Sequence, residues 1–114
     1  GDACRIGGGT HAPDYREPKA IWVPTSTAPS GLAFYTGPFP EWQGSLFSGA
    51  LAGATLWRIT LDGNGNAVSR QEVAAVKALN VRIRDVRQGP DGNLYLLTND
   101  GNGANANRIV RLAP

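Results

Sequence analysis

The sequence contains few of the residues that cross-link, anchor or strongly charge a protein. A single cysteine, Cys4, excludes a disulfide bond within the chain. The single histidine, His11, lies among glycine and proline, so we interpret it as a loop residue and not as a general base. No stretch approaches the ~20 consecutive apolar residues of a membrane-spanning helix. We therefore expect neither an internal disulfide nor a membrane span.

Charge is also low, because charged residues make up 18% of the chain and the formal net charge is +2. This balance indicates neither nucleic acid nor an anionic membrane as a partner. The acidic turns at 62–66 and 99–102 lack the glutamate and the Asp-x-Asp-x-Asp spacing of calcium loops, so we interpret them as hairpin turns. No metal site, and in particular no calcium site, is expected in this chain.

Glycine and proline, by contrast, are abundant, with 15 and 8 residues. Together with short alternating apolar runs, they predict an all-β fold with many turns. Residues 1–20 show no periodicity and are interpreted as a leader or connecting loop. A first unit, 21–80, has predicted strands at 21–23, 32–35, 45–51, 55–61 and 68–73, and 74–80 is compatible with a short helical turn. A second unit, 81–114, has predicted strands at 83–87, 94–98 and 108–112, with a long hairpin loop at 99–107.

The segment from Val81 to Thr98 carries the clearest sign of chemistry. Strict alternation places Ile83 and Asp85 on one face of a strand, and Arg82 and Arg84 together on the other. Two guanidinium groups on one face suit a ligand with several anionic or carbonyl oxygens, because each can bind bidentately. The alternative is that both arginines bind neighbouring carbonyl groups or Asp85 and serve only the structure. The residues alone leave both interpretations open.

Several motifs, in this order, resemble the C-terminal part of a known family. They are Ala28–Gly37 (APSGLAFYTG), Phe39–Trp42, Leu46–Leu51 (LFSGAL), Arg82–Val86 (RIRDV) and Gly89–Thr98 (GPDGNLYLLT). The family is that of the soluble sugar dehydrogenases that use pyrroloquinoline quinone (PQQ), the glucose/sorbosone dehydrogenase group, which includes the aldose sugar dehydrogenases. The resemblance runs from about Trp22 to Leu112.

The resemblance implies a fold of antiparallel β-propeller blades in a six-bladed ring. The chain would supply one complete four-stranded blade, 21–80, and three strands of the closing blade, 81–114. Such a chain leaves an apolar flank uncovered, so we expect its partners to be the missing N-terminal blades or copies of itself in an oligomer. The family also implies a periplasmic or secreted location, although no signal peptide is recognised in the sequence.

The resemblance further implies a cofactor site. Arg82 and Arg84 would contact PQQ, Asp85 would hold one of their forks in place, and Trp22 would line the cofactor face. The chain departs from the family at Ala52, where a cofactor-binding lysine is common, and this departure implies weaker quinone binding. Lys77 lies too far along the chain to be assumed a substitute.

Two functions follow from these observations. The first is the C-terminal part of a quinone-dependent aldose or glucose dehydrogenase, which forms one wall of the cofactor site. It would be inactive alone, because the family's catalytic base lies in earlier blades and no catalytic residue is expected here. The alternative is a non-catalytic, propeller-like binding or self-assembling module derived from that family. Ala52 favours the module, whereas the intact pair of Arg82 and Arg84 favours the enzyme.

Overall fold

The computed structural model describes residues 18–22, 25–100 and 107–113. Within these residues the chain forms seven strands and two short helical elements. They are β1 (Pro29–Phe34), the 3-10 helix η2 (Pro40–Trp42), β2 (Leu46–Ala50), β3 (Thr55–Leu61), β4 (Ala67–Glu72), α1 (Ala74–Lys77), β5 (Arg82–Gln88), β6 (Leu94–Asn99) and β7 (Ile109–Leu112). No helix in the described part of the chain is long and apolar enough to cross a membrane.

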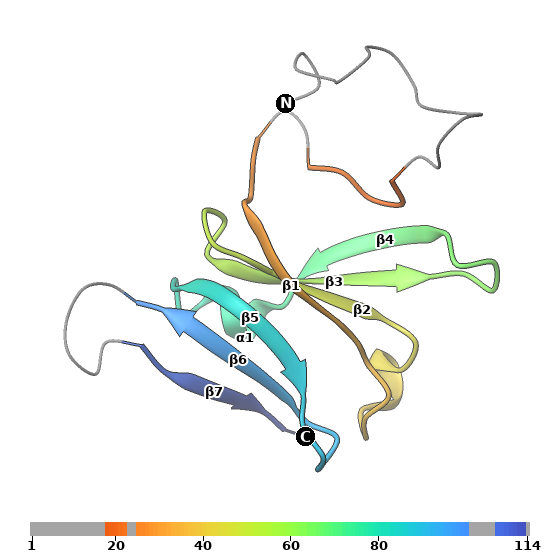
Figure 1. The fold of residues 1–114 in the computed structure, drawn as a ribbon. Coiled ribbons are helices and arrows are strands. Elements are labelled where there is room, and N and C mark those ends of the chain that lie inside the picture. The colour runs from red at the N-terminus through yellow and green to blue at the C-terminus, as the bar shows by residue number, and fades with distance from the viewer. Residues whose placement is uncertain (1–17, 23–24, 101–106, 114) are drawn as a thin grey trace.

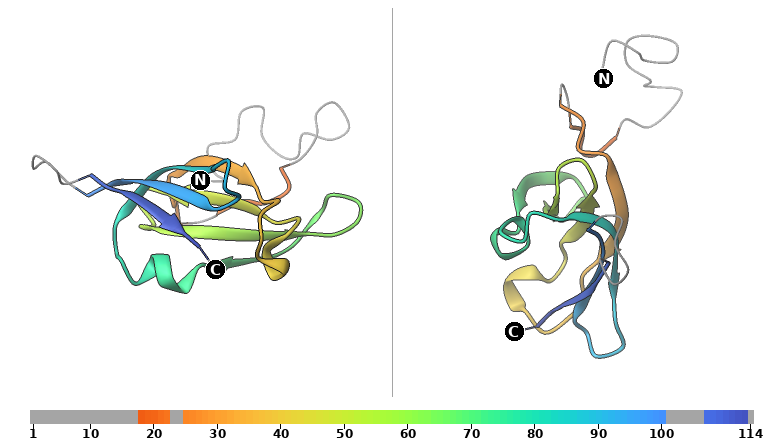
Figure 2. Two further views of the ribbon diagram at one scale, coloured as in Figure 1. Left: turned by 90° about the horizontal axis from the view of Figure 1, so that it is seen from below. Right: turned by 90° about the vertical axis from the view of Figure 1, so that its left-hand side faces the viewer.

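The strands form two antiparallel sheets, one with the order β1-β2-β3-β4 and one with the order β5-β6-β7. The all-β prediction is therefore confirmed. The first strands of the two sheets, β1 and β5, lie next to each other, and the sheets spread apart toward β4 and β7 (Figure 1). Further views show α1 in the connection that leads from the first sheet to the second (Figure 2).

The hydrophobic core lies between the two sheets. Its fully buried side chains come from both, among them Phe47, Leu56, Ile83, Val86 and Leu96. Gly49 of β2 lies directly against β5, because a Cβ atom added there would be 2.7 Å from Ile83 Cγ2. That space is already filled, so the close packing of the sheets depends on the missing side chain.

Replacement of this glycine provides a test of the packing. We expect Gly49→Ala to lower the free energy of unfolding by about 1–3 kcal/mol, the usual cost of overpacking a filled core. Gly63→Ala is the matched control, because a Cβ atom there meets no atom within 4 Å. Urea unfolding followed by tryptophan fluorescence measures both variants, and equal stability of the two would contradict the packing described here.

The turn between β5 and β6 is held by one carboxylate. Asp91 Oδ2 accepts a hydrogen bond of 2.6 Å from the Tyr95 hydroxyl, and Asp91 Oδ1 accepts one of 3.0 Å from the Asn93 N–H. Arg111 of β7 adds an ion pair at 3.9 Å. The Tyr95 bond, followed by the Asn93 bonds, lowers the pKa of Asp91 below its ordinary value of 3.8. The same bond raises the pKa of Tyr95.

These shifts predict an acid-sensitive contribution to stability. The pKa of Asp91 is lower in the folded state than its ordinary value of 3.8, so the ionised carboxylate stabilises the folded protein at pH values above 3.8. This contribution is lost as the pH falls through the lowered folded value. We expect Asp91→Asn to reduce the fall in melting temperature between neutral and strongly acidic pH. Tyr95→Phe, which keeps the charge but removes the largest cause of the shift, should reduce it less. An unchanged acid dependence in both variants would argue against this assignment.

The structure differs from the sequence-based expectations in several places, and β1 begins at Pro29 and not at residue 32. Ile21 and Trp22 do not form a strand, and Val23, the third residue of the predicted strand, lies outside the described residues. Strict alternation in β5 is also wrong, because a bulge between Ile83 and Asp85 shifts the register. As a result Ile83 and Val86 are both buried, and Asp85 does not share the face of Ile83. The predicted leader, 1–20, lies almost entirely outside the described residues.

Candidate functional site

The two predicted arginines lie at the start of β5. Arg82 pairs with Asn99 of β6, and Arg84 is the extra residue of the bulge. Both side chains are exposed. Among the described residues neither guanidinium forms an ion pair or a hydrogen bond. Within the part of the chain that the structure describes, therefore, no residue gives either group a structural partner.

Asp85 binds a different arginine from the one expected. Its Oδ2 atom accepts a hydrogen bond of 3.1 Å from Nε of Arg87, and its Oδ1 atom accepts one of 2.9 Å from the N–H of Val86. The expectation that Asp85 holds a fork of Arg82 or Arg84 is thus wrong. The reason is the bulge, which changes the direction of the side chains on its two sides. Asp85 therefore stabilises the part of β5 that follows the two arginines.

The same end of the molecule contains the turn between β2 and β3. Because β1 and β2 are antiparallel, with Pro29 opposite Ala50, the turn after β2 lies beside the start of β1. The N–H groups of Leu51 and Gly53 donate to the carbonyl oxygens of Ala28 and Thr27, at 3.0 and 3.1 Å. These bonds fix the loop before β1 to the turn. Ala52, the position at which the resemblance leads one to expect a lysine, is exposed in this turn.

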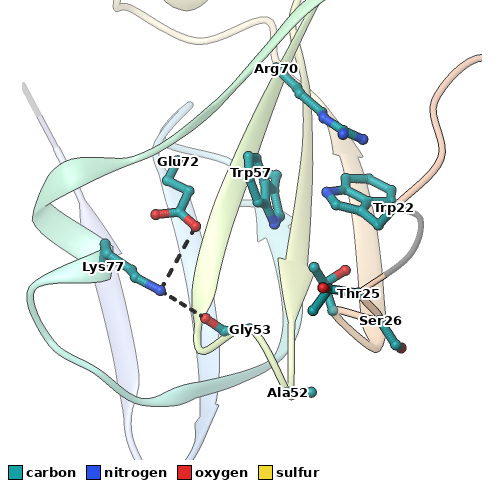
Figure 3. A pocket seen from close by; sticks show the side chains of 10 residues that line it. Trp22, Thr25, Ser26, Ala52, Gly53, Trp57, Arg70, Glu72 and Lys77 are labelled. Carbon is teal, nitrogen blue, oxygen red and sulfur yellow. Dashed lines mark hydrogen bonds and ion pairs between the residues drawn. The ribbon is translucent and has the colours of Figure 1, made fainter.

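Lys77 reaches this turn from α1. Its ammonium group donates to the Gly53 carbonyl oxygen at 3.2 Å and lies 3.8 Å from a carboxylate oxygen of Glu72 (Figure 3). Distance along the chain suggested no such contact. The order of the elements could have predicted this contact. Since β4 runs antiparallel to β3, the helix that follows β4 begins beside the start of β3. A cation therefore contacts this turn, at the residue after Ala52.

Trp22 lies over the outer strands of the first sheet. Its ring is 5.9 Å from that of Trp57 in β3, and the guanidinium of Arg70 in β4 lies 5.3 Å from the Trp22 ring centre. Arg70 also donates to the carbonyl oxygen of Ile21. These rings, with Lys77 and the turn, border a hollow of about 380 Å³ (Figure 3). The arginine pair, in contrast, lies on the first strand of the second sheet.

Comparison with known proteins gives the family. A family model described as glucose / sorbosone dehydrogenase matches residues 1–111. The chain belongs to this family. The resemblance seen in the sequence is thereby confirmed. No cluster of three or more metal-ligating side chains occurs in the described residues.

Curated relatives are considerably longer than the chain. Aldose sugar dehydrogenase YliI of Escherichia coli (strain K12) is 42% identical over 99 residues, which cover 86% of the chain and 24% of that protein. Uncharacterized protein slr1608 of Synechocystis sp. (strain ATCC 27184 / PCC 6803 / Kazusa) is 42% identical over 95 residues, which cover 82% of the chain and 22% of that protein. The chain thus spans about a quarter of the length of these relatives.

Solved structures agree with this assignment. A structure titled glucose dehydrogenase is 39% identical and superposes with a TM-score of 0.75, covering 87% of this chain and 29% of that one. The soluble aldose sugar dehydrogenase from Escherichia coli in the apo-form is 35% identical with a TM-score of 0.65, covering 78% and 24%. The two sheets therefore have the arrangement of 29% of the first structure and 24% of the second.

Proposed function

We propose that this chain forms one wall of the quinone site in a PQQ-dependent aldose or glucose dehydrogenase, with Arg82 and Arg84 as the groups that bind the cofactor. The observation that carries the proposal is that both guanidiniums are exposed and without a partner among the described residues. PQQ is planar and carries three carboxylates and two adjacent quinone oxygens. Two guanidinium forks fit such a set of acceptors.

The cofactor would supply the hydride acceptor for oxidation of the anomeric carbon of an aldose. The contribution of this chain is to bind and orient. Arg82 and Arg84 neutralise carboxylates, and the turn at Ala52 with the neighbouring Lys77 borders the same end of the sheets. The one histidine of the sequence, His11, lies outside the described residues and no family motif surrounds it. Another part of a longer protein would therefore provide the base, and the chain alone would not oxidise sugar.

We further propose that the two sheets are neighbouring propeller blades, the second of them completed by another strand. The outer face of the first sheet is apolar and open, with Leu32 62% and Phe34 54% exposed. At the open edge of the second sheet, β7 exposes Ile109 to 74%. Exposed apolar surface and an unpaired strand edge are both features that another sheet or strand would cover. The greater length of the relatives supports a preceding blade as the occupant. In such an enzyme the site would lie in a periplasmic or secreted protein.

Substitution of the arginines tests the cofactor site. In the full-length protein that contains this segment, Arg82→Lys and Arg84→Lys keep the charge but lose the fork. We expect each to weaken PQQ binding by ~1–3 kcal/mol, the scale of a charged hydrogen bond. Arg111→Lys, on β7 and paired with Asp91, is the matched control and should leave the affinity unchanged. Titration of tryptophan fluorescence with PQQ gives the dissociation constants. Parental affinity in both arginine variants would refute the site.

A non-catalytic, self-assembling module is the second candidate, because Ala52 lacks the family's lysine and the apolar face could equally pack on a copy of itself. For the isolated 114-residue chain, both candidates predict self-association through this face. We expect Leu32→Glu to shift the chain toward monomer in sedimentation velocity, since the carboxylate would be buried in the contact. Leu79→Glu, in the loop after α1, is the control. A monomeric parent chain would exclude the module. PQQ binding by the full-length protein would favour the enzyme.

A further inference from the structure

Two bulges on neighbouring strands lie against each other beside the arginine pair. The register of β1 shifts between Ser30 and Leu32, so Gly31 is its extra residue, as Arg84 is in β5. Gly31 has φ +66°, and a Cβ atom added there would overlap Asp85 Oδ1 and lie 2.8 Å from the Val86 nitrogen. The Ser30 hydroxyl donates to the carbonyl oxygen of Ile83. The two irregularities are therefore packed as one unit.

The bulge in β5 decides where Arg84 can point. In a regular strand, burial of Val86 would carry Arg84 to the buried face, because side chains two apart share a face. If a regular strand instead had Ile83 on its buried face, Asp85 would be buried and Val86 would be exposed. In the structure Ile83 and Val86 are both fully buried, and Arg84 is exposed between them. Only the extra residue allows both Ile83 and Val86 to be buried, so the bulge is what keeps Arg84 exposed while Val86 remains in the core.

We infer that Asp85 and Gly31 are positioning residues, which hold the bulge that presents Arg84 beside Arg82. The carboxylate of Asp85 binds the N–H of Val86 and Nε of Arg87, and so fixes the backbone immediately after the bulge. Gly31 leaves the space that this carboxylate occupies. In this role neither residue would need to contact the cofactor. The inference rests on the proposed function only in taking PQQ as the ligand of Arg84.

A double-mutant cycle separates this role from a general effect on folding. In the full-length protein we expect Asp85→Ala to weaken PQQ binding by roughly tenfold, the scale of interaction energies between neighbouring residues. In an Arg84→Lys background it should change the affinity by less than about twofold, because the group it positions is already altered. In an Arg82→Lys background the full loss should remain. Equal losses in all three backgrounds would overturn the inference, since they would show that Asp85 does not act through Arg84.

A ligand-independent measurement distinguishes failure of the inference from failure of the proposed function. In a Cys4→Ser background, Arg84→Cys places a thiol at the bulge. We expect this thiol to react with a disulfide reagent at the rate of an exposed thiol. Addition of Asp85→Ala should slow that reaction severalfold, and Gly31→Ala should do the same. Absence of PQQ binding to the parent protein would refute the proposed function alone. An unchanged thiol rate would refute the inference.

Folding of each variant is checked by its melting temperature. If Asp85→Ala does not fold, Asp85→Asn takes its place, because the amide oxygen can still accept the Val86 N–H while the charge opposite Arg87 is lost. Partial loss of affinity that disappears in the Arg84→Lys background supports the inference. Parental affinity together with a parental thiol rate contradicts it.

Discussion

The direct contact between β1 and β5 is the constraint on which the rest of the structure depends. Two glycines allow it, Gly31 at the start of β1 and Gly49 in β2, each facing the backbone or a side chain of β5. Without side chains at these positions the first strands of the two sheets approach closely, while their outer strands spread apart (Figure 1). This contact brings the two sheets together around the shared core. It also sets the start of β5, with its exposed arginines, beside the start of β1 and the turn at Ala52.

The first sheet has apolar side chains on both faces, and the two faces differ in how far they are covered. One face carries Phe47 and Leu56 into the core shared with the second sheet. The other carries Leu32 and Phe34, and part of it is covered by the segment at Trp22, which Arg70 binds through a cation–π contact and a hydrogen bond. A sheet that is apolar on both sides is typical of an inner layer. The uncovered part of the second face is the surface on which the proposal of a neighbouring blade depends.

Most of the fold could be predicted from the sequence, because local signals and tertiary packing agree. The bounds of β3 match the prediction, since its alternation ends at the Asp62 turn, where Asp62 Oδ1 accepts from two backbone N–H groups. The predicted strand at 21–23 fails at Ile21 because its carbonyl oxygen binds a side chain and not a neighbouring strand. The bulge at Arg84 had no local signal. It depends on Gly31, more than fifty residues earlier in the sequence, and on burial of residues on both sides of it.

The contact between Lys77 and the turn at Ala52 has a consequence for the way relatives of this chain are compared. Read one position at a time, the sequence shows only the small apolar side chain of Ala52 in this turn. In the folded chain the ammonium group of Lys77 reaches this turn from α1, 3.2 Å from the carbonyl oxygen of Gly53 and 3.8 Å from a carboxylate oxygen of Glu72. A comparison of this chain with another one residue at a time therefore overlooks a positive charge that α1 brings to the turn.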